Sequence, residues 1–161
     1  PINRHNECPD TEKERQINVN RVYVYCEKNG HVPFFSFYEE LPAKMQQKVW
    51  KGIRCLAIFP NYRTEPHVKH FTLERYRGFY EYRERIRILF RVIFVFDANK
   101  DIILLAPFVK QRDRDTHKAL ERSLAMGDYQ RYRRLYRIRC PSVLRLGDIG
   151  AVMNFGSAVT A

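Results

Sequence analysis

Apolar and polar positions alternate over residues 21–28, which predicts a first strand, and the Asn-Gly pair at 29–30 predicts a turn after it. Over residues 34–58 the apolar positions instead recur at three- and four-residue spacing, which predicts two helices. Pro42 divides them, because proline is favoured in the first turn of a helix and disfavoured inside one. We expect both apolar stripes to pack in the core.

Three more apolar runs follow a polar link at 61–74. They cover residues 79–84, 88–96 and 102–109 and are separated by short turns, so they predict an antiparallel meander. Pro107 lies inside the last run and lacks an amide hydrogen. It therefore predicts a bulge or a sheet edge at that place.

A last helix is predicted from about residue 116 to residue 134, with capping residues at 113–116 and with Gly127 weakening its middle. The order strand, helix, helix, three strands, helix predicts an α+β fold: one small antiparallel-rich sheet with the helices packed on one face. We divide the chain into an N-terminal arm (1–20), one domain (21–135) and a C-terminal extension (136–161) to which the sequence assigns no role.

The charge of the chain points to a class of binding partner. The chain of 161 residues has a formal net charge of +11, and arginine outnumbers lysine 20 to 9. Arginine forks onto phosphate and stacks on bases, and many tyrosines and phenylalanines are interleaved with it, a mixture that suits RNA. The alternative is that the aromatic residues fill the core while the arginines form a solvated surface. The excess of arginine favours nucleic acid.

Other classes of protein find little support. No apolar run is long enough to cross a membrane, and the first residues do not resemble a signal peptide, so we expect a cytoplasmic protein without a membrane partner. The four cysteines are widely scattered and lack the close spacing of metal or redox motifs. We therefore expect neither a metal site nor a cofactor.

With this order of elements, the sequence resembles the RelE-like toxin superfamily, in particular its HigB-like, phage-derived branch. The resemblance covers roughly residues 21–133. It is carried, in order, by Val-Tyr-Cys-Glu-Lys-Asn-Gly, Phe-Tyr-Glu-Glu-Leu-Pro-Ala-Lys-Met-Gln-Gln-Lys-Val, Glu-Pro-His-Val-Lys-His-Phe, Gly-Phe-Tyr-Glu-Tyr-Arg, Phe-Arg-Val-Ile-Phe-Val-Phe, Leu-Leu-Ala-Pro-Phe-Val-Lys and His-Lys-Ala-Leu-Glu-Arg.

The resemblance implies a toxin of a toxin–antitoxin system that cleaves mRNA without a metal, often at the ribosome, and that a helix-turn-helix antitoxin neutralises. It puts Arg83, Arg91 and Lys110 at the family's basic positions on the sheet, where we expect the catalytic residues. Arginines that stay charged can stabilise the charge of a cleaving phosphodiester. Further RNA-binding residues are expected at Lys69, His70, Arg85, Arg87 and Arg112.

The sequence also departs from the family pattern. Gln111 stands where a second cation usually follows Lys110, and Ala106-Pro107 replaces the usual His-Gly. His67 or His70 could supply the missing acid or base. A second hypothesis therefore stays open: a basic module without catalytic activity, either a degraded toxin or a phage-type protein that binds a host target.

Overall fold

The computed structural model describes residues 20–85, 87–127 and 136–138. An α+β fold is confirmed. The elements are β1 (Val22–Val24), α1 (Pro33–Glu39), α2 (Ala43–Ile58), the short 3-10 helix η2 (Pro60–Arg63), β2 (Val68–His70), the 3-10 helix η3 (Glu74–Tyr76), β3 (Phe79–Arg85), β4 (Leu89–Phe96), β5 (Ile102–Val109), α3 (Asp113–Ala125) and β6 (Tyr136–Ile138).

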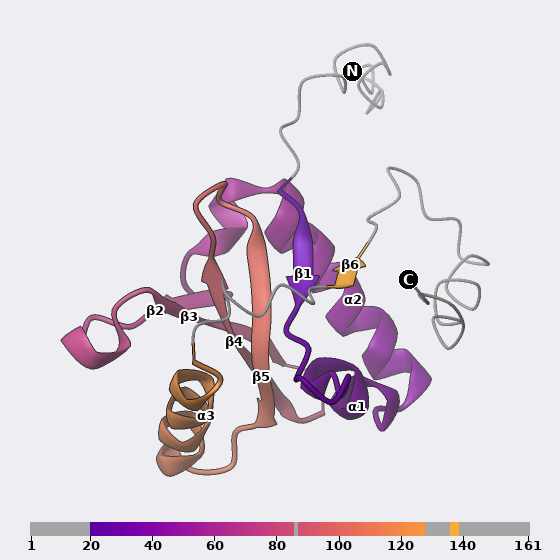
Figure 1. The fold of residues 1–161 in the computed structure, drawn as a ribbon. Helices are drawn as coiled ribbons and strands as arrows, with labels where there is room; N and C mark the ends of the chain where they lie inside the picture. Colours follow the sequence, from indigo (N-terminus) through magenta and orange to yellow (C-terminus); the bar gives the residue numbers. More distant parts are fainter. Residues whose placement is uncertain (1–19, 86, 128–135, 139–161) are drawn as a thin grey trace, which may run out of the picture.

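One sheet forms the centre of the fold, with the strand order β2-β3-β4-β5-β1-β6 (Figure 1). The predicted antiparallel meander is confirmed, because β3 pairs with β4 and β4 pairs with β5 in antiparallel fashion. β2 extends the meander at one edge. β1 pairs with β5 in parallel fashion and with β6 in antiparallel fashion, so the sheet is mixed.

Helices cover both faces of this sheet. α1 and α2 pack against one face, to which Val92 and Phe94 of β4 contribute. α3 packs against the other face, to which Ile93 and Val95 contribute (Figure 1). The expectation that all helices share one face is therefore wrong. The reason is that β4 and β5 are apolar at successive positions, and a strand that is apolar on both sides needs cover on both sides.

The pairing of β5 with β4 shifts by one residue just before Pro107, which confirms the predicted bulge. Ile103, before the shift, and Phe108, after it, both lie on the α3 face although they are an odd number of residues apart. In an uninterrupted strand two such residues would point to opposite faces. By the same alternation, Lys110 follows Phe108 onto the α3 face.

Two other boundaries differ from the prediction. The polar link contains the strand β2, which is too short and too polar for its alternation to be recognised. α3 begins at Asp113 and not at residue 116, because the Asp115 carboxylate accepts the backbone N–H groups of Gln111 and Arg112 (2.9 and 2.7 Å) and so fixes the first turn. Gly127 has a φ of +67° after the helix end. The predicted continuation over 128–134 lies outside the described residues.

α2 lies very close to β3. The apolar stripe of α2 is buried as predicted, through residues such as Val49 and Ile53. Between these two residues a Cβ on Gly52 would overlap the hydroxyl of Tyr82. That hydroxyl is fully buried and donates a hydrogen bond of 2.8 Å to Glu84. A glycine is thus needed for helix and sheet to approach this closely.

Candidate functional site

The register of β3 and β4 places Arg83 directly opposite Arg91. Both side chains belong to the α3 face, because Arg91 alternates with Ile93 and Arg83 alternates with Phe79, two residues of the apolar cluster on that face. Two like charges opposite each other destabilise a sheet unless something compensates them. The pair therefore needs a neighbouring acid.

Glu81 is that acid, and its side chain is almost completely buried, at 2% exposure. One carboxylate oxygen accepts a hydrogen bond of 2.7 Å from Nε of Arg83 and lies 3.6 Å from Nε of Arg91. The other oxygen accepts a hydrogen bond of 3.2 Å from the hydroxyl of Thr116 on α3. Sheet and helix thus hold one buried carboxylate between two arginines.

Arg91 is the more deeply placed cation of the pair, at 13% exposure. One terminal nitrogen donates to the carbonyl of Phe90 (3.0 Å), whereas the buried Nε has no hydrogen-bond partner. Burial lowers the pKa of Arg91, with a further lowering from Arg83, while the charge of Glu81 acts in the opposite direction. A guanidinium with unfilled donors in a poorly solvated place is suited to binding an anion.

Exposed acids cover the outer cations of the site. Arg83 also donates to Glu65 from the link (2.8 Å), and Nζ of Lys110 lies 3.0 Å from Asp113 at the start of α3. The side chains of Glu65 and Asp113 are 63% and 100% exposed. Such surface pairs are weak, so a phosphate group could replace either acid.

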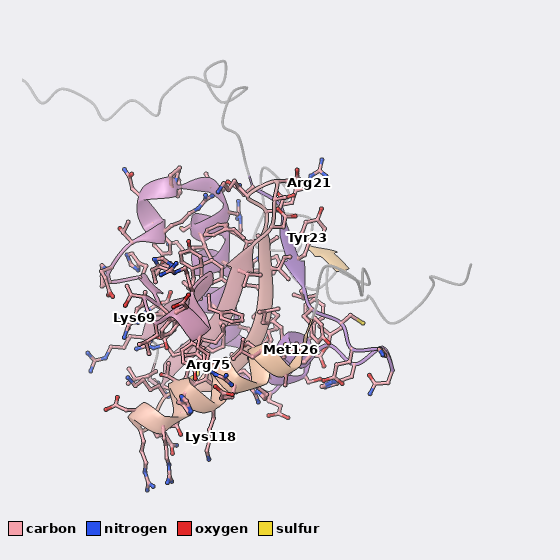
Figure 2. All side chains as sticks on the ribbon, turned by 60° about the vertical axis from the view of Figure 1, so that its left-hand side comes forward. Arg21, Tyr23, Lys69, Arg75, Lys118 and Met126 are labelled. Carbon is pink, nitrogen blue, oxygen red and sulfur yellow. The ribbon has the colours of Figure 1, made fainter. Side chains whose placement is uncertain are left out.

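Of the residues predicted to bind RNA, Lys69 lies on this side of the sheet. Lys69 of β2 pairs with Glu81 in the register and its Nζ lies 5.5 Å from the centre of the Phe71 ring, on the α3 face. Figure 2 shows Lys69 at this edge of the sheet, Arg75 beside α3 and Lys118 on α3. Three further arginines are exposed. Arg85 ends β3, Arg87 lies in the turn after it, and Arg112 precedes α3.

The histidines are engaged elsewhere. The ring of His70 stacks on Tyr80 at 4.7 Å, on the α2 side of the sheet, so it does not join the arginines. His67 stacks on Tyr62 at 3.9 Å. Both imidazoles are thus stacked on tyrosines, and no local pattern in the sequence indicates these two stacks.

No local pattern indicates that Thr116 bonds Glu81 or that Glu65 bonds Arg83, because both come from segments outside β3 and β4. Among the described residues, no group of three or more histidine, cysteine or acidic side chains could hold a metal ion. Over the same part of the chain, no helix is long and apolar enough to cross a membrane.

The fold and this face together define a small RelE-like α+β domain that presents paired cations on one side of its sheet. Residues 36–126 match the family described as phage derived protein Gp49-like (DUF891). The match covers more than half of the chain, which therefore belongs to this family, a family related to toxins of the RelE and HigB type. A comparison with curated proteins finds no match.

Proposed function

We propose that this protein is the toxin of a toxin–antitoxin pair and that it cleaves mRNA at the ribosome without a metal ion. Membership of the Gp49-like family supports a toxin broadly. The observation that carries the nuclease proposal is the convergence of cations on the α3 face. Arg83 and Arg91 face each other across two strands, and the bulge in β5 turns Lys110 to the same face.

In the proposed reaction the ribose 2′-oxygen attacks the adjacent phosphorus, the bond from phosphorus to the 5′-oxygen breaks, and a 2′,3′-cyclic phosphate and a 5′-hydroxyl result. The proton of the 2′-hydroxyl is lost to a base and the 5′-oxygen gains a proton from an acid. Arg83 and Arg91 stabilise the charge on the non-bridging oxygens. Lys110 binds the phosphate or acts as the base that takes the proton of the 2′-hydroxyl.

The substrate reaches the cations by replacing Glu65 on Arg83 and Asp113 on Lys110. Lys69 and the exposed arginines 85, 87 and 112 extend the positive surface along the RNA, a role in which they add affinity without sequence preference. The antitoxin that neutralises such a surface is expected to present acidic or amphipathic structure to it.

A second function is favoured by a different observation, namely the stacking of His67 and His70 on tyrosines. Because the imidazoles of His67 and His70 are stacked on tyrosines, the nuclease proposal assigns proton transfer to Lys110. A basic module that binds RNA or a host protein without cleaving anything would need only the cations.

Expression in bacteria tests the two functions against each other. The wild-type chain and the variant Arg83→Gln/Arg91→Gln are induced, growth is followed, and mRNA ends are mapped by primer extension. Arrest with new cleavage ends in the wild type alone would support the nuclease. Arrest without new ends would favour a module that inhibits by binding. No arrest by a folded wild-type protein would refute the nuclease and favour a degraded toxin.

The matched control removes two positive charges elsewhere. Lys44 and Lys51 are exposed residues of α2, on the other side of the sheet. The variant Lys44→Gln/Lys51→Gln has the same net charge as the arginine variant and is expected to keep the arrest and the cleavage. If it lost both, net charge and not the arginine pair would explain the effect.

A further inference from the structure

A small aromatic pocket lies where α2 ends, outside the arginine site. α2 stops at Ile58, and η2 starts at Pro60. Phe59 lies between them with 53% of its surface exposed. The pocket is lined by Phe59, Pro60, Asn61, Tyr62 and His67.

Folding does not explain the exposed ring of Phe59. A phenylalanine left in water forgoes the free energy that its burial would provide, about 1.5–3 kcal/mol. Within the described residues, Leu73 is the other large apolar side chain with such exposure, at 68%, and it lies in the loop before η3. Phe59 differs from Leu73 because it forms part of a pocket with two other rings.

The two other rings are held in place before any ligand arrives. Tyr62 and His67 stack with centroids 3.9 Å apart and planes inclined by 14°. The backbone N–H of Tyr62 donates to the carbonyl of Phe59 (3.0 Å), and that of His67 donates to Thr64 (3.0 Å). A fixed stack loses little conformational entropy when a further planar ring joins it.

The pocket is next to the arginine site. The carbonyl of His67 accepts the backbone N–H of Arg83 at 2.8 Å, so the two residues are neighbours across the β2–β3 edge. Glu65, two positions before His67, contacts the Arg83 guanidinium. The pocket and Arg83 thus meet at the β2 edge of the sheet, with Tyr62 packed on the α2 side. A nucleotide attached to a phosphate on Arg83 has to turn around this edge to enter the pocket.

We propose that this pocket receives one unpaired base of single-stranded RNA, from the nucleotide next to the phosphate bound by Arg83. The base stacks on the aromatic rings, and the Asn61 amide, a donor and an acceptor, faces the base edge. The inference rests on the proposed function, since it takes RNA as the ligand. The net charge of +11 complements the RNA backbone that carries this base.

Fluorescence anisotropy with a labelled single-stranded RNA heptamer tests the pocket. The 2′-hydroxyls are methylated so that the RNA cannot be cleaved, and a series of heptamers lacks the base at one position each. Phe59→Ala and His67→Ala are expected to weaken binding of the complete heptamer by roughly tenfold, the scale of one stacked base. The heptamer that lacks the base entering the pocket should bind the wild type with a similarly reduced affinity. Neither variant should weaken the binding of this heptamer further.

Leu73→Ala is the matched control, because it removes an even more exposed apolar side chain outside the pocket, and it should bind like the wild type. If Phe59→Ala and His67→Ala both bound like the wild type while Arg83→Ala lost affinity, the pocket would be refuted and the nuclease proposal would stand. A wild-type protein that bound no heptamer would overturn the pocket, whereas the nuclease proposal, which places cleavage at the ribosome, is decided by the mapping of mRNA ends. If the two pocket variants lost the same affinity for every heptamer of the series, the pocket would also be refuted, because the loss would then not depend on any one base.

Discussion

Arg83 and Glu81, two positions apart on β3, are joined by a hydrogen bond of 2.7 Å from Nε to the carboxylate. The same carboxylate oxygen lies 3.6 Å from Arg91, the residue opposite Arg83. One buried negative charge thus permits two positive charges to face each other. It also fixes the direction of Arg83, because the bonded Nε leaves the far end of the guanidinium for Glu65 or a phosphate.

The first prediction concerns this buried acid. Glu81→Gln keeps the shape of the side chain but removes its charge, which leaves two arginines facing each other without the buried carboxylate between them. Breaking a buried ion pair from one side typically costs about 3–5 kcal/mol, so we expect a loss of unfolding free energy near the lower value, measured by urea denaturation. Glu65→Gln, at an exposed partner of the same arginine, should change stability little. Equal losses for both variants would contradict this account.

The second prediction concerns the acid that covers Lys110. Asp113→Asn removes the ion pair of 3.0 Å at the start of α3 while keeping a side chain that tolerates a helix start. RNA affinity should rise a few-fold at low salt and the gain should shrink as salt is added, because the pair is exposed and screened. Binding is measured with the uncleavable heptamer. Glu39→Gln, an exposed acid at the end of α1, is the control for net charge, and an equal gain from it would refute the specific role of Asp113.

The third prediction concerns the contact of α2 with β3. Gly→Ala inside a helix normally stabilises by about 1 kcal/mol. Gly52→Ala should instead destabilise by about 2 kcal/mol or more, since its Cβ would overlap the Tyr82 hydroxyl. Thermal unfolding measures whether the variant is less or more stable than the wild type. In a Tyr82→Phe background, Gly52→Ala should lower the stability by less than it does in the wild type. An unchanged loss of stability would show that the overlap with the hydroxyl is not the cause.

The fourth prediction concerns pH. Arg75 donates two hydrogen bonds to Glu121 on α3 (3.0 and 2.7 Å), and Tyr76 donates another. The Arg75 bonds first, and then that of Tyr76, lower the pKa of Glu121 from 4.5 to about 2. A lowered acid pKa stabilises the folded state fully above about pH 4.5. That contribution is lost as the pH falls through about 2.

Carbon-13 NMR of the Glu121 carboxyl group measures this titration directly. Arg75→Gln should move the midpoint back toward the ordinary value, whereas Arg77→Gln, an exposed neighbour, should not. An ordinary midpoint in the wild-type protein would contradict the link between η3 and α3.

The core elements could be predicted because their patterns are local. The apolar spacing of α1 and α2 and the long strands β4 and β5 needed no knowledge of distant partners. The sequence also contained enough information to predict that a helix covers the second face of the sheet. A sheet with one covered face alternates apolar and polar residues, but residues 102–106 are apolar throughout, which indicates cover on both faces.

The site could be predicted only in part. A resemblance indicated Arg83, Arg91 and Lys110, but whether they share a face depended on a one-residue shift in strand pairing. Pro107 suggested a bulge without fixing the position of the extra residue. The placement of Thr116 beside Glu81 depends on packing between α3 and β3, and no local pattern contains it.

The parallel pairing of β1 with β5 has a consequence for synthesis of the chain. Val22 pairs with Ile102, so β1 can pair with β5 only after the ribosome has added the next eighty residues. Until then the apolar side chains of β1 and α1 cannot be enclosed by the finished sheet, and such distant pairing slows folding. Lys110 and Thr116 follow β5 in the chain, so the complete cationic face can form only after the partner of β1 has been synthesised.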